Sequence, residues 1–88
     1  MKMMLKDAPG AREFINSVIH AAEDVAIAVT GLPDNGVKAM LEVTRANLAR
    51  DLAPDMGAAT AAEFADIFVS TVMGEKHERE QLMSMGIL

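Results

Sequence analysis

The chain has 88 residues and a formal net charge of −5, with 13 acidic residues, 8 basic residues and no cysteine. A chain of this length forms one domain, and the absence of cysteine excludes both disulfides and thiolate-bound zinc as supports for a small core. The acidic balance and the scattered lysines and arginines exclude the clustered positive charge that binding to a nucleic-acid backbone requires.

Apolar residues first recur with helical spacing after residue 7. Asp7 is a suitable N-cap, and Pro9 and Gly10 fit the opening turn of a helix. The second half of this predicted helix is apolar on nearly every face, so we expect it to be buried on more than one side, as the central helix of a bundle or the seam of a dimer would be. Gly31 should end it in the left-handed conformation. The apolar positions are Phe14, Ile15, Val18, Ile19, Ala22, Val25, Ala26, Ile27 and Val29.

A second amphipathic helix is predicted after a turn over residues 32–36, in which Pro33 fixes the backbone φ angle. Pro54 should end this helix, because proline cannot donate a backbone hydrogen bond. The buried stripe is predicted to consist of Val37, Met40, Leu41, Thr44, Leu48 and Leu52.

A third helix is predicted to begin near Thr60, because Thr60 and Glu63 have the spacing of a capping box. Its expected buried stripe is Phe64, Ile67, Phe68, Thr71 and Val72, with Glu63, Asp66 and Ser70 facing outward. Gly74 is a candidate break. The fold class is therefore predicted to be all-α, a small bundle of three main helices within a single domain over residues 1–88.

The last part of the chain is predicted to be a helical extension made of a charged spacer and an apolar tail, residues 75–88. Its charged stretch is polar on every face, and the spacing of Glu75 with Arg79 and of Lys76 with Glu80 supports a helix. We expect this stretch to stay unburied and to carry the tail beyond the bundle.

Apolar residues at both ends of the chain, including the segment 1–7, indicate either packing on the chain's own core or an interface. Two apolar surfaces on a domain of marginal size favour self-association, and we expect a homodimer. The expected interface residues are Met4, Leu5, Val25, Ile27, Val29, Leu82, Met83, Met85, Ile87 and Leu88.

Catalytic and metal sites have little support in the sequence. His20 with Glu23 and His77 with Glu80 each stand at i,i+3, but di-iron bundles use the reverse order, so we interpret both as surface pairs. Ser17 and His20 share a face without an oxyanion donor or an orienting acid. We expect neither a catalytic site nor a cofactor or metal.

The remaining predictions concern function and location. A helix-turn-helix over residues 48–66 would present carboxylates to DNA, so we expect no direct nucleic-acid binding. No apolar stretch approaches the roughly 20 residues of a membrane span and no signal peptide is evident, which favours the cytoplasm.

We therefore predict a non-enzymatic interaction module, a small acidic homodimeric regulator or inhibitor that occupies a surface of another protein. Its expected partner-facing acidic surface consists of Glu23, Asp24, Glu42, Glu63 and Asp66. One alternative is a carrier of a small apolar ligand or metal in a pocket lined by Phe14, Phe64 and Phe68. Another is an acidic mimic of nucleic acid that inhibits a nucleic-acid-binding enzyme.

Overall fold

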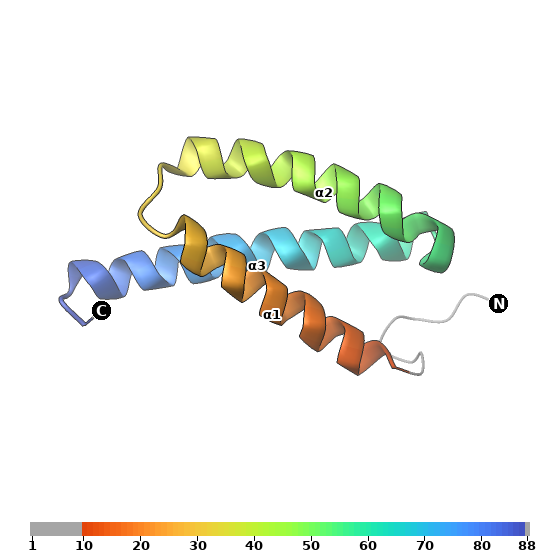
Figure 1. Ribbon diagram of the computed structural model, residues 1–88, viewed down its shortest axis with the longest axis horizontal. Helices are drawn as coiled ribbons and strands as arrows, with labels where there is room; N and C mark the ends of the chain where they lie inside the picture. Colours follow the sequence, from red (N-terminus) through yellow and green to blue (C-terminus); the bar gives the residue numbers. More distant parts are fainter. Residues whose placement is uncertain (1–9, 88) are drawn as a thin grey trace.

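The protein consists of three α-helices, and no strand is present in residues 10–87, the part that the computed structural model describes. In chain order the helices are α1 (Ala11–Val29), α2 (Asp34–Met56) and α3 (Ala58–Ser84) (Figure 1). The prediction of an all-α fold is confirmed. Residues 1–7, with Met4 and Leu5, and Leu88 lie outside the described residues. None of the three helices is both long and apolar enough to cross a membrane.

The central element is α3, against which α1 and α2 each pack. Figure 1 shows α1 and α2 diverging from their connecting turn, with α3 running between them in this view. The extents of 50 × 24 × 14 Å describe a thin body, whose smallest dimension accommodates two layers of helix. The prediction of α1 as the central helix of the bundle is wrong, because α3 packs against both other helices and Ile27 of α1 is 53% exposed. The alternative, that α1 forms the seam of a dimer, stays a prediction.

The core is built largely from small side chains, which allow α1 and α2 to approach α3 closely. Phe64 and Leu41 are its largest fully buried apolar residues. Two other members of the predicted stripes, Phe14 and Met40, are exposed like Ile27. The buried apolar residues are Ala22, Ala26, Val29, Val37, Leu41, Ala61, Phe64, Ala65, Val69 and Val72.

The connection between α1 and α2 is short. Gly31 has a φ of 89°, which confirms the predicted left-handed residue after α1. Pro33 immediately precedes α2, so Asn35 and Gly36, predicted to lie in the turn, belong to the first turn of this helix. This arrangement follows from the fixed φ of proline, which suits the residue at a helix start.

A single residue, Gly57, connects α2 to α3. Its φ of 86° and ψ of 155° lie in a region open almost only to glycine. Its N–H donates to the carbonyl of Ala53 at 2.8 Å, and its carbonyl accepts from the N–H of Ala61 at 3.0 Å. Two predicted boundaries are therefore wrong. Helix α2 continues past Pro54, which near the helix end removes only its own hydrogen bond, and α3 begins at Ala58 without a capping side chain at Thr60.

Helix α3 passes Gly74 without a break and continues to Ser84. The charged stretch after Gly74 differs from the predicted spacer, because Lys76 is only 1% exposed. In Figure 1 the C-terminal end of α3 extends beyond the α1–α2 turn. The charged part of the helix is therefore packed against the bundle, whereas its apolar end projects from it.

Candidate functional site

An apolar groove lies between α1 and α2, with α3 as its floor. It exists because both helices pack on α3 and diverge from each other. Its volume is about 380 Å³. The eight side chains of the groove follow helical spacing on α1 and α2 and include one residue of α3; they are Phe14, Ser17, Val18, Ala21, Thr44, Leu48, Leu52 and Phe68. None of them is fully buried, so the groove is an accessible surface of the protein.

Within residues 10–87, the side chains that line the groove offer no free polar donor. Its two hydroxyls both donate to backbone carbonyls of their own helices, Ser17 Oγ to Glu13 at 3.0 Å and Thr44 Oγ1 to Met40 at 3.1 Å. The other six side chains are apolar. Small-molecule sites combine an apolar lining with a few polar groups that fix the ligand, and this groove lacks such groups among its side chains. The lining is therefore suited to contact with an extended apolar surface rather than with a small polar ligand.

Two of the three phenylalanines take part in the groove. Phe14 is 37% exposed and meets the ring of Phe64 edge-on, with the ring centroids 4.6 Å apart and the planes at 86°. Phe64 is fully buried behind it, and Phe68 forms part of the floor. The predicted pocket of Phe14, Phe64 and Phe68 is thus present at two residues and wrong at Phe64, which supports Phe14 rather than lining the space.

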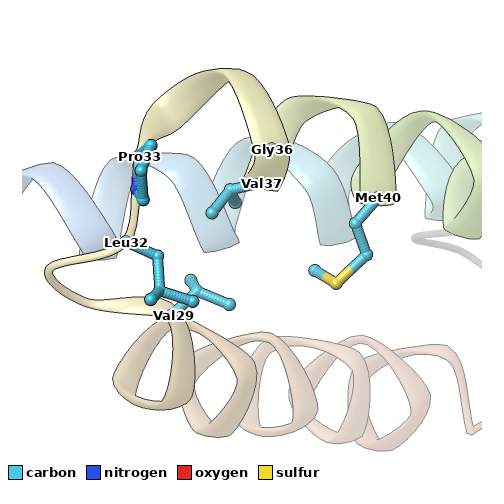
Figure 2. A pocket seen from close by; sticks show the side chains of 6 residues that line it. All are labelled: Val29, Leu32, Pro33, Gly36, Val37 and Met40. Atoms are coloured by element: carbon cyan, nitrogen blue, oxygen red, sulfur yellow. The ribbon is translucent and has the colours of Figure 1, made fainter.

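A second apolar pocket lies at the α1–α2 turn. Its volume is about 210 Å³, and it is lined by Val29, Leu32, Pro33, Gly36, Val37 and Met40 (Figure 2). Met40 stands one helical turn before the groove residue Thr44, so the same face of α2 serves both spaces. The face of α2 from Met40 to Leu52 is therefore accessible and largely apolar.

A cluster of charged side chains fastens the α1–α2 turn to α3. Lys76 Nζ donates to Asp34 Oδ1 at 2.5 Å and to Glu80 Oε2 at 2.7 Å, and the second contact confirms the predicted pairing on α3. The backbone N–H of Gly31 donates to Glu80 at 2.7 Å, and His77 Nε2 lies 3.0 Å from Asp34 Oδ2. We call these residues, Gly31, Asp34, Lys76, His77 and Glu80, the turn clamp.

The turn clamp shifts the ionisation of three of its members. The hydrogen bond from Lys76, followed by that from His77, lowers the pKa of Asp34. Lys76 and the Gly31 amide likewise lower the pKa of Glu80. The hydrogen bonds to Asp34 and Glu80 raise the pKa of Lys76. All three groups are therefore held in their charged forms at neutral pH, which suits a structural role.

A metal ion could find ligands in the turn clamp, because one ligand atom each from Asp34, His77 and Glu80 lie within 4.8 Å of one another. However, the ammonium group of Lys76 already lies between the two carboxylates. A metal would have to displace a buried cation. Of the two predicted surface pairs, His20 and Glu23 are in contact, with His20 Nδ1 3.1 Å from Glu23 Oε1. His77 contacts Asp34 instead of the predicted Glu80.

The predicted interface residues fall into two groups. Val29 lies in the core, and Val25 is partly buried against it. Ile27, by contrast, is exposed, as are the tail residues Met83, Met85 and Ile87, while Leu82 is half-buried. The hydrogen bond between Gly31 and Glu80 brings the end of α1 close to the start of this tail. The exposed members therefore share one end of the molecule.

The predicted acidic surface is not one continuous face. Asp66 and Glu42 both contact Arg45, at 3.3 Å and 3.6 Å, and Glu23 contacts His20. Asp24 and Glu63 are exposed on α1 and α3, and neither forms an ion pair with residues 10–87. The available negative charge is therefore smaller and more local than the composition suggests.

The chain matches no known family model, no curated protein and no solved structure. The interpretation of the groove therefore rests on its residues and geometry.

The sequence predicted a pocket with Phe14 and Phe68 as one alternative, but it placed no residue of α2 in that pocket. Thr44, Leu48 and Leu52 were predicted to be buried, whereas they line the groove and are only partly buried. The turn clamp had a weaker signal. The i,i+4 spacing of Lys76 and Glu80 suggested one contact, but the contact with Asp34 joins residues 42 positions apart.

Proposed function

We propose that this protein is a non-enzymatic interaction module that binds an apolar face of another protein in the groove between α1 and α2. The observation that carries the proposal is an accessible groove whose side chains offer apolar surface and no free polar donor. A partner that fills it would gain burial of apolar area, the main favourable term in protein association. By occupying such a surface of its partner, the protein would act as a regulator or inhibitor.

The dimensions of the groove favour a helix as the bound element. Phe14 to Ala21 spans about 10 Å of α1, and Thr44 to Leu52 spans about 12 Å of α2, at 1.5 Å per residue. These lengths match two turns of a helix that presents residues i, i+3, i+4 and i+7. The bound helix would contact α1, α2 and Phe68 and would become the fourth helix of the bundle.

The direct test is titration with a neutral helical peptide of about 18 residues that carries leucine at every third or fourth position. Ala21→Gln introduces a polar amide at an exposed groove position and should weaken binding about tenfold, because the amide loses water without gaining a partner. Ala46→Gln makes the same change at an exposed position of α2 outside the groove and should leave affinity unchanged. Equal affinities for the two variants would contradict the proposal.

Self-association is proposed at the opposite end of α3 from Gly57. The exposed apolar side chains there, Ile27, Leu32, Met83, Met85 and Ile87, support a contact between two copies. Light scattering over a dilution series should give a mass that falls from dimer to monomer. Met85→Asp should shift that transition to higher protein concentration, and an unchanged transition would show that this end is not the interface.

A carrier of a small apolar ligand is the second candidate, supported by the presence of Phe14 and Phe68 in the groove. The two functions differ in the molecule that should bind the groove, a small apolar compound for a carrier and a helical peptide for an interaction module. A carrier should bind a small hydrophobic fluorophore in stoichiometric amounts, and the leucine peptide should displace it only if both share the groove. Stoichiometric fluorophore binding that Ala21→Gln abolishes, together with no peptide binding, would favour the carrier.

A further inference from the structure

We infer that the partner segment in the groove is an amphipathic helix flanked by lysine or arginine side chains. The inference rests on the proposed function and adds the charge of the partner to it. The groove itself selects only apolar surface, so selectivity among the many amphipathic helices of other proteins must come from its rim. The rim carries a net negative charge.

Four carboxylates stand beside the groove by helical spacing. Glu13 is four residues before Ser17, and Asp24 is three residues after Ala21, so each follows the groove face of α1. Asp51 and Asp55 stand three residues after Leu48 and Leu52 on α2. All four are exposed.

Two arginines of α2 near the rim are already paired, whereas Arg12, exposed beside Glu13 at the start of α1, forms no ion pair within residues 10–87. Arg45 contacts Glu42 and Asp66 on the side of α3. Arg50 contacts Asp51 at 3.1 Å and compensates that one carboxylate. Within residues 10–87, no basic side chain lies within ion-pair distance of Glu13, Asp24 or Asp55. In the described part of the chain, three carboxylates beside the groove therefore lack an ion-pair partner, against one unpaired arginine, Arg12.

The same charges disfavour a second copy of this chain in the groove. Each copy carries a net charge of −5. The exposed apolar tail, which is the obvious segment to offer, follows a stretch in which Lys76 and Glu80 are paired and the remaining charges are Glu75, Glu78 and Arg79. Like charges at an interface oppose association, whereas a basic helix would be attracted and guided to the groove. Charge complementarity thus favours a basic partner over the protein itself.

The experiment compares three synthetic helical peptides with the same leucine face and with lysine, glutamine or glutamate on both flanks, each titrated against the full chain at low salt. We expect the lysine peptide to bind about tenfold more tightly than the glutamate peptide, with the glutamine peptide between them. Raising the salt concentration should reduce the difference.

Variants of the rim locate the effect. The double variant Glu13→Gln, Asp24→Asn should bring the lysine and glutamate peptides closer in affinity. Glu63→Gln, which removes one exposed charge from α3 outside the groove, is the matched control and should preserve most of the difference. Melting curves of both variants check that they remain folded.

Each other result overturns a different statement. Equal binding of all three peptides, lost in Ala21→Gln, would overturn the basic partner and leave the groove as a binding site. Lysine-peptide binding that Ala21→Gln does not weaken would be charge attraction outside the groove, and the inference would fail. No binding of any peptide would contradict the proposed function itself. Conversion of a dimer to a monomer by Ala21→Gln would show that a second copy occupies the groove.

Discussion

At the residue scale, the position of Lys76 is the least expected feature of the molecule. A buried ammonium group is costly unless opposite charges and hydrogen bonds compensate it. Here Asp34 and Glu80 both contact it, and the Gly31 amide supplies a further hydrogen bond to Glu80. The turn clamp thereby joins three segments, the end of α1, the start of α2 and the last third of α3. The divergence of α1 and α2 starts from this fixed point.

We expect Lys76→Met to lower the melting temperature, although methionine fills a similar volume. The reason is that the substitution leaves Asp34 and Glu80 close together without the cation that compensates them. Lys38→Met, at an exposed position of α2, is the control and should have little effect. Thermal unfolding followed by circular dichroism measures both. Equal melting temperatures for the two variants would show that the clamp does not stabilise the fold.

The turn clamp also predicts how stability depends on pH. The pKa values of Asp34 and Glu80 are lowered, so their contribution is present above the ordinary values of 3.8 and 4.5 and is lost as the pH falls through the folded-state values. The pKa of Lys76 is raised, so its contribution is present below 10.5 and is lost as the pH rises through the folded-state value.

Urea unfolding across the pH range should therefore show a plateau with a decline at each end. In Lys76→Met the alkaline decline due to Lys76 should disappear, and the acidic decline should be weaker because the two carboxylates have lost the main cause of their lowered pKa. Parallel pH profiles for the wild type and the variant would contradict this role of the clamp.

At the element scale, the sequence predicts the helices well and their ends less well. The apolar spacing of Phe64 and Val72 reflects burial against neighbouring helices, which is a property of the pattern itself. The boundary at Gly57 depends instead on whether one residue can adopt a backbone conformation that reverses the chain. A capping box at Thr60 was a plausible competitor, and the conformational freedom of glycine decided the outcome.

We expect Gly57→Ala to lower the free energy of unfolding by about 1–3 kcal/mol, because alanine is strained at a φ of 86° and a ψ of 155°. Gly74→Ala is the contrasting variant. Gly74 lies inside α3, and a β-carbon at this position would meet open space, so alanine should raise the free energy of unfolding by about 0.5–1 kcal/mol. Chemical denaturation of both variants tests the sign of each effect. A stabilising Gly57→Ala would show that the chain reversal does not need glycine.

At the scale of the whole molecule, the sequence predicted only part of the groove, the two phenylalanines Phe14 and Phe68. The apolar stripes of α1 and α2 are each wide enough to pack on α3 and to leave further apolar residues that do not contact it. The angle between α1 and α2 decides whether these remaining apolar residues contact each other or face solvent. That angle is set by contacts such as the one between Lys76 and Asp34, whose long sequence separation gives no periodic signal. Phe14 and Phe68 were therefore predicted to line a pocket, but Thr44, Leu48 and Leu52 of α2 were predicted to be buried rather than to line it.

The open arrangement of the three helices has a consequence for binding. Since α1 and α2 are held by α3 and by the turn clamp, the groove exists before a partner arrives, which reduces the cost of ordering it on association. Because α1 and α2 diverge, they do not pack along their lengths, and a bound helix would fill the space between them. Under the proposed function, the architecture is a bundle with one helix position left to a partner.

The most direct test is to map the contact surface by nuclear magnetic resonance. Isotope-labelled protein would be titrated with the lysine-flanked leucine peptide, and the amide chemical shifts would be followed. Binding in the groove predicts the largest changes at residues 14–21 of α1, residues 44–52 of α2 and Phe68, with little change around Glu63. Changes confined to the outer face of α3 or to the tail at residues 82–87, with the groove residues unaffected, would contradict the assignment of the groove as the binding surface.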